Sequence, residues 1–177
     1  MFDATAINDL AHFVEAVIDR FYDRWNPARG QHTRVFRRLA NRYGVEFLGC
    51  GIHRVVFRHG DLVYKVPHNS KGIDANLREL KVWETADHGV RGYLAASHEV
   101  VAGVLVAEYA GSSVHSMMSD SSNEEWARIN AIAENVRTDI SSILENLLRT
   151  LWKGGAHVDL HAGNISVEGL VLDYAGC

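Results

Sequence analysis

Two oxygen-bearing side chains near the end of the sequence are spaced as ligands of a metal ion would be. Asn164 precedes, and Asp173 follows, a stretch in which two apolar runs flank Glu168-Gly169. This pattern predicts a tight β-hairpin that carries Asn164 at its entry and Asp173 at its exit, close together in space. Amide and carboxylate oxygens suit Mg²⁺, a hard cation that also binds phosphates. We therefore expect Asn164 and Asp173 to hold Mg²⁺.

A third oxygen-bearing side chain, Asp159, lies five residues before Asn164. A carboxylate facing the same place would act as a base or orient a reacting hydroxyl. The alternative is turn chemistry alone, because Asp and Asn favour turns through hydrogen bonds to their own backbone. This segment by itself leaves both interpretations open.

A second set of residues, in the first half of the chain, is suited to phosphate. Gly49 and Gly51 occupy a turn, where missing side chains would let backbone N–H groups approach an anion. Lys65 lies within an apolar run, a costly place for an ammonium unless its tip meets an anion. Paired glycines alone are a weak signal, but glycines followed by such a lysine are a stronger one.

The elements that must position these residues give an α+β fold. Short apolar runs bounded by turn residues predict five antiparallel strands, at about 45–48, 54–58, 62–66, 97–101 and 104–108. Apolar residues at helical spacing predict helices at 4–25, 31–43 and 74–87. A fourth, long helix opens at the capping box Ser122-x-x-Glu125 and stops at Gly154-Gly155.

These residues resemble motifs of the protein-kinase-like superfamily. Gly49, Gly51 and Val56 match its Gly-x-Gly-x-x-Gly-x-Val, with Arg54 in the third glycine's place, and Lys65 matches the lysine of Val-Ala-Ile-Lys. The segment 157–165, His-Val-Asp-Leu-His-Ala-Gly-Asn-Ile, is similar to the catalytic loop, and is closer to aminoglycoside and choline phosphotransferases than to protein kinases.

The metal loop, Asp-Tyr-Ala-Gly at 173–176, is one residue longer than the family's Asp-x-Gly. The resemblance covers about 45–176 and implies a phosphotransferase that uses ATP and Mg²⁺. Lys65 would hold the α- and β-phosphates, Asp159 would take or orient the acceptor hydroxyl, and Asn164 and Asp173 would ligate the metal. The nucleotide would also contact Gly49, Gly51, Arg54, Val56, Glu108, Tyr109 and Ala110.

In this interpretation 108–111 is a hinge whose backbone binds adenine; the alternative is an edge strand that runs into a linker.

A kinase-like site also needs a glutamate that pairs with Lys65. Glu79 is followed at i+3 and i+4 by Val82 and Trp83, so its side of the helix is partly apolar and turned inward. Glu84 is followed by polar residues and looks solvated. We predict Glu79 as the partner; a plain surface carboxylate is the alternative.

The resemblance further predicts a bilobal arrangement of three segments. These are an N-terminal helical extension (1–44), a nucleotide-binding lobe with the five-stranded sheet (45–111), and a truncated helical lobe with the catalytic and metal-binding loops (112–177). The two leading helices are expected to supply packing that C-terminal helices give in the family. The small size suggests a minimal core of viral origin.

A second hypothesis is a catalytically weak or inactive kinase-like module that binds and modulates a partner protein, motivated by Arg54 and by the truncated acceptor side. The acceptor itself stays open. His161 stands where protein kinases carry a lysine, which favours a small molecule or an atypical acceptor. An open acceptor side favours a protein, including another copy of the chain.

Composition argues against other classes. The net charge is −4, so no overall basic field calls for nucleic acid or an anionic membrane. The arginines at 34, 37, 38 and 42 form a local basic face that a solvated helix explains. No signal segment is evident, no apolar run approaches the roughly 20 residues that span a bilayer, and two cysteines give no disulfide framework. We expect a cytoplasmic protein, in the host cytoplasm if viral, for which nucleic acid is an improbable partner.

Overall fold

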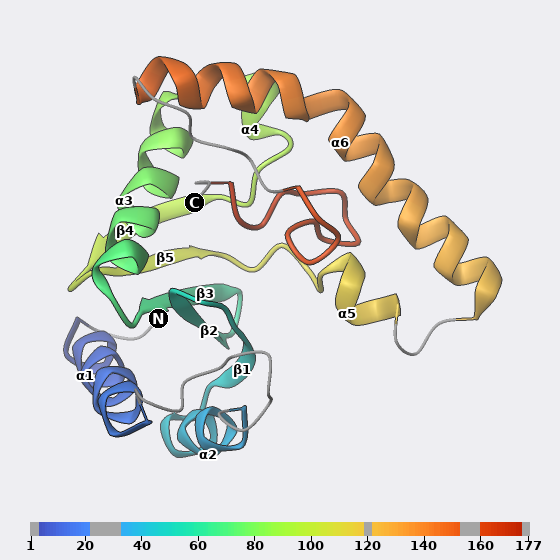
Figure 1. Cartoon of the computed structure of the whole chain (residues 1–177). Coiled ribbons are helices and arrows are strands. Elements are labelled where there is room, and N and C mark those ends of the chain that lie inside the picture. The colour runs from blue at the N-terminus through green and yellow to red at the C-terminus, as the bar shows by residue number, and fades with distance from the viewer. Residues whose placement is uncertain (1–3, 22–32, 119–121, 153–159, 175–177) are drawn as a thin grey trace. The chain divides into compact units, whose positions relative to one another are not determined.

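The computed structural model describes residues 4–21, 33–118, 122–152 and 160–174 (Figure 1). The chain divides into two compact units. The first comprises residues 1–80 and 97–109, and the second comprises residues 81–96 and 110–177.

The first unit is built on one five-stranded antiparallel sheet with the strand order β1-β2-β3-β5-β4 (Figure 1). The strands are β1 (Glu46–Cys50), β2 (Arg54–His59), β3 (Leu62–Pro67), β4 (Ser97–Val101) and β5 (Val104–Glu108). Gly60 joins β2 to β3 at a φ of 61°, a left-handed conformation that glycine adopts at little cost. The α+β class and the five predicted antiparallel strands are confirmed.

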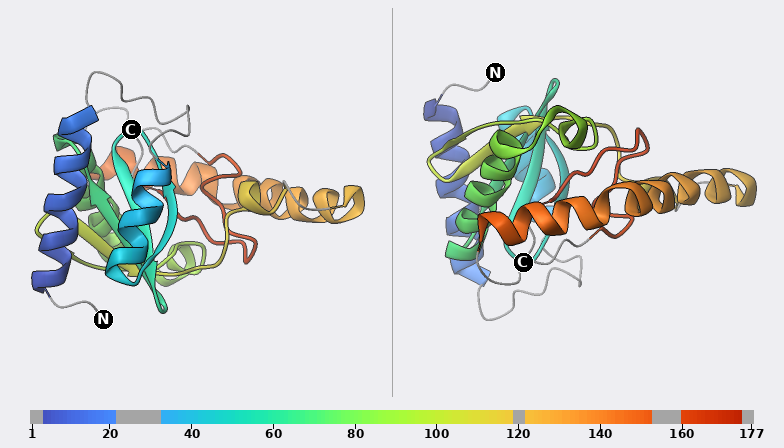
Figure 2. Two further views of the ribbon diagram at one scale, coloured as in Figure 1. Left: turned by 90° about the horizontal axis from the view of Figure 1, so that it is seen from below. Right: turned by 90° about the horizontal axis from the view of Figure 1, so that it is seen from above.

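Two helices, α1 (Ala4–Phe21) and α2 (Thr33–Tyr43), cover one face of this sheet (Figure 2). Successive strand residues point to opposite faces, and one set meets the helices: Val55, Phe57, Tyr64, Val66, Val104 and Val106. The helices contribute Ile7, Leu10, Val14, Val17, Phe36, Leu39 and Ala40 to this core. The buried sides of α1 and α2 thus belong to the core of the sheet, and a role in place of the family's C-terminal helices stays a prediction.

The third helix, α3 (Ser70–Thr85), follows β3 and buries Asn76 and Glu79. It begins four residues before the predicted start at 74. The Oδ1 atom of Asn69 accepts a hydrogen bond from the Gly72 N–H (3.0 Å), which satisfies a backbone donor in the first turn.

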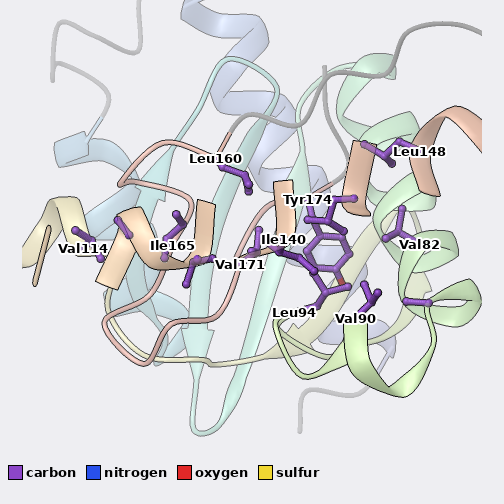
Figure 3. Packing of buried hydrophobic residues seen from close by; sticks show 14 of the residues in the cluster. Val82, Val90, Leu94, Val114, Ile140, Leu148, Leu160, Ile165, Val171 and Tyr174 are labelled. Carbon is purple, nitrogen blue, oxygen red and sulfur yellow. The ribbon is translucent and has the colours of Figure 1, made fainter. Parts of the chain in front are cut away.

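The second unit contains α4 (His88–Arg91), α5 (Val114–Met118) and α6 (Asn123–Leu151). Ser122 is the N-cap residue of α6, as predicted, and its side chain accepts a hydrogen bond from the Glu125 N–H (3.4 Å). One side of α6 is buried, and its buried residues are Ile129, Ala133, Val136, Ile140, Leu144 and Leu148. This stripe packs with a set that includes Leu94, Val114, Ile165, Val171 and Tyr174 (Figure 3). Across the described ranges, no helix has the length and apolarity needed to cross a bilayer.

Candidate functional site

Lys65 lies in the middle of the sheet, on the face opposite α1 and α2. It is paired with Val56 of β2 and Leu105 of β5, and only 6% of the residue is exposed. Its neighbours Tyr64 and Val66 point the other way into the core with α1 and α2. The alternation of the strand therefore places the ammonium on the α3 side.

The buried partner of Lys65 is Glu79 of α3. Lys65 Nζ donates to Glu79 Oε1, and the Glu79 residue is fully buried. Glu84, the other candidate, is exposed and lies 3.9 Å from the Lys81 ammonium. The predicted partner of Lys65 is thus the observed one, whereas the catalytic roles of Lys65 and Glu79 stay predictions.

Arg54 at the start of β2 also bonds to Glu79. Its Nη1 atom lies 2.8 Å from Glu79 Oε2 and 3.0 Å from Asn76 Oδ1, and the residue is 8% exposed. One carboxylate therefore bonds two buried cations, one at each oxygen. The resemblance to kinases predicts that Arg54 contacts phosphate. In the structure Nη1 faces α3, and a phosphate contact stays a prediction.

Asn76, which was not among the predicted site residues, completes the cluster. Its Nδ2 atom donates to the backbone carbonyls of Lys65 (2.8 Å) and Gly103 (2.7 Å), while Oδ1 accepts from Arg54. The side chain is fully buried with its hydrogen bonds formed. A polar residue three positions before Glu79, on the same side of the helix, was the available signal.

The glycine turn between β1 and β2 is held by its own backbone. The Gly51 N–H donates to the Arg54 carbonyl (2.8 Å), so this group does not point freely toward an anion. Gly49 follows a register shift in β1.

Burial raises the pKa of the Cys50 thiol, between Gly49 and Gly51, to about 12, so Cys50 stays neutral at physiological pH. Val56 is half-buried on the same face as Lys65.

The same turn packs against the start of α3. His68 Nε2 lies 3.3 Å from the Gly51 carbonyl, and the His68 N–H donates to the His53 carbonyl (3.1 Å). A Cβ atom on Gly72 would come within 2.3 Å of that His53 oxygen, so only glycine fits. Burial lowers the pKa of His68, an effect that its bond to the Gly51 carbonyl opposes.

The proposed adenine-binding backbone lies at 108–110. Glu108 pairs with Leu62, and the Tyr109 N–H donates to the Asp61 carbonyl (2.8 Å). The Arg58 guanidinium stacks 3.6 Å from the centroid of the Tyr109 ring. The Tyr109 N–H is therefore already used within the sheet unit. Adenine contacts at Glu108, Tyr109 and Ala110 stay predictions.

The predicted hairpin after Asn164 is present. Ile165 forms an antiparallel bridge with Val171, Gly169 has a φ of 81°, and the Leu172 N–H donates to the Asn164 carbonyl (2.8 Å). Asn164 thus lies across the hairpin from the residue that precedes Asp173. Asn164 and Asp173 are both half-buried, and their role as Mg²⁺ ligands stays a prediction.

The predicted base, Asp159, lies outside the described residues, as does the rest of the catalytic-loop segment before Leu160. Within the ranges that the structure describes, no three or more His, Cys, Asp or Glu side chains gather as metal ligands. No family model, curated protein or solved structure matches the chain.

Proposed function

We propose that this protein is a kinase-like phosphotransferase that uses ATP and Mg²⁺ and transfers the γ-phosphate to a hydroxyl of a protein or small molecule. The observation that carries the proposal is the buried ion pair between Lys65 of β3 and Glu79 of the following helix. In protein kinases, a lysine on the third strand pairs with a glutamate on the next helix and binds nucleotide phosphates.

The energetics of burial support a role beyond stability. Removing two charges from water costs several kcal/mol per ion, and a well-packed apolar pair is often as stable. A lysine and a glutamate kept in such a place are better explained by a ligand that needs the charge.

In the proposed mechanism, catalysis is mainly positioning and electrostatics. Lys65, oriented by Glu79, would hold the α- and β-phosphates. Asn164 and Asp173 would hold Mg²⁺, which neutralises developing charge on the phosphates when bound. Asp159 would take or orient the acceptor hydroxyl. The proposal includes a bilobal kinase-like fold, with the nucleotide-binding lobe at 45–111 and the helical lobe at 112–177.

A second candidate function is a partner-binding module with weak or no catalysis. The hydrogen bonds of Arg54 to α3 and of the Gly51 N–H to the Arg54 carbonyl favour it, because both groups would otherwise be available to phosphate.

The test of the proposed function is phosphate transfer from γ-labelled ATP, alone and with cell lysate. We expect slow transfer by the isolated protein and faster labelling of a lysate protein, both lost in Asp159→Ala and Asp173→Ala. Glu168→Ala is the matched control, because Glu168 is an exposed carboxylate in the same hairpin. Absence of both ATP binding and label would leave the partner-binding module as the better account.

A further inference from the structure

We propose that Arg54 and Asn76 are positioning residues that hold Glu79 against Lys65 before any nucleotide binds. The consequence for catalysis rests on the proposed function, but the positioning itself is a property of the nucleotide-free protein. The inference comes from a closed hydrogen-bond network that links α3 to the sheet at several points.

The first step concerns the two oxygens of Glu79. Oε1 accepts from Lys65 and Oε2 accepts from Arg54 (2.8 Å). Lys65 and Arg54 come from neighbouring strands, since Arg54 pairs with Pro67 in the β2–β3 register. The carboxylate is therefore fixed at both oxygens and cannot turn away from Lys65 without breaking its charge-assisted bond to Arg54.

The second step concerns Asn76, one turn before Glu79 on α3. Through Nδ2 it bonds the Lys65 carbonyl of β3 and the Gly103 carbonyl in the turn before β5. Through Oδ1 it accepts from Arg54 of β2 (3.0 Å). One buried amide thus ties the helix to two strands and a turn, and it also orients the arginine that orients Glu79.

Together these bonds make displacement of α3 costly. Moving the helix would separate Glu79 from two cations in a buried environment and leave the amide of Asn76 and two backbone carbonyls without these partners. A nucleotide would then meet a lysine whose glutamate is already in place. We infer that the ion pair is permanently assembled and is not formed on ligand binding.

The test is the rate at which an acylating reagent modifies Lys65 in the nucleotide-free protein, followed by mass spectrometry. Glu79→Gln defines the rate for a lysine without its carboxylate. If Arg54 positions Glu79, then Arg54→Met and Asn76→Leu loosen the pair, and modification accelerates toward that reference, by roughly tenfold for a lost bond to a charged group. Arg58→Met, a change on the same strand and face, should leave the rate unchanged.

The opposite result overturns the proposal. If Arg54 acts only as a neighbouring positive charge, its removal leaves Glu79 paired with Lys65 only. Modification of Lys65 then slows or stays the same. Folding of each variant is checked by circular dichroism. Should Arg54→Met not fold, Arg54→Lys decides, because it keeps the charge but lacks the guanidinium fork. An accelerated rate supports positioning, and the wild-type rate contradicts it.

Binding of ATP with Mg²⁺ is measured on the same variants, so that the two proposals can fail separately. Lys65 modification that accelerates as expected in a protein that binds no ATP would remove the proposed function and keep the positioning. Normal ATP binding, with unchanged modification of Lys65 in Arg54→Met and Asn76→Leu, would remove the positioning and keep the proposed function.

Discussion

At the residue scale, the sharing of Glu79 between Lys65 and Arg54 is the most informative feature of the molecule. The sequence indicated Lys65, because an ammonium within an apolar strand needs an anion, and it indicated Glu79, because apolar residues follow it at i+3 and i+4. It did not indicate that Arg54, in the place of a family glycine, would bond to the same carboxylate. That contact depends on how α3 packs against β2.

The burial of His68 predicts that the stability of the protein depends on pH. Its folded-state pKa lies below the usual 6.5, chiefly through burial. Below pH 6.5 the unfolded chain therefore takes up a proton that the folded chain resists, so stability falls as the pH drops from about 6.5 toward the folded-state pKa. We expect His68→Gln to weaken this dependence of the free energy of unfolding on pH, as measured by urea unfolding.

His12→Gln is the control for that experiment, because His12 is an exposed histidine on α1. If the free energy of unfolding of His68→Gln depends on pH below 6.5 as that of the wild type does, His68 does not contribute to the change.

At the element scale, the contact between the turn at 51–53 and α3 predicts that replacing Gly72 lowers stability. Gly72→Ala would place a Cβ atom 2.3 Å from the His53 carbonyl oxygen, a backbone atom that cannot yield easily. We expect a loss of roughly 1–3 kcal/mol, the usual range for overpacking, measured by chemical denaturation. Gly49→Ala, where a Cβ atom meets open space, should cost far less. Equal losses would contradict the packing described here.

The elements themselves were largely predictable. The strands were found because turns with glycine at 49, 51, 60 and 103 separate short apolar runs. The helix α6 was found because a capping-box sequence and a long apolar stripe coincide. The helices α4 and α5 were missed, since four or five residues are too few to show a helical period. The start of α3 was missed because its cap, Asn69, follows Pro67-His68 and precedes Gly72, a composition that favours turns.

At the scale of the whole molecule, the role of α1 and α2 could not be predicted. The resemblance begins near residue 45, so residues 1–44 were taken as an extension. The buried side chains of α1 and α2 form half of the core on one face of the sheet. Periodicity shows that a helix has an apolar side and cannot show which surface that side meets.

This arrangement predicts that α1 stabilises the five-stranded sheet. Leu10 is fully buried in the shared core, so we expect Leu10→Ala to lower the free energy of unfolding by about 2–5 kcal/mol. Leu77→Ala is the matched control, because Leu77 is 51% exposed on α3. A change at Leu10 as small as the one at Leu77 would mean that 1–44 is a separate extension.

The most direct test of the central claim, that the pair of Lys65 and Glu79 serves a nucleotide, is calorimetric titration with ATP in the presence and absence of Mg²⁺. We predict Mg²⁺-dependent binding to the wild type and a loss of roughly tenfold or more in affinity for Lys65→Met, the factor expected for one lost bond to a charged group. Lys81→Met, which removes an exposed lysine of α3, should bind as the wild type does. Absence of binding to the wild type, or equal binding by Lys65→Met, would contradict the claim.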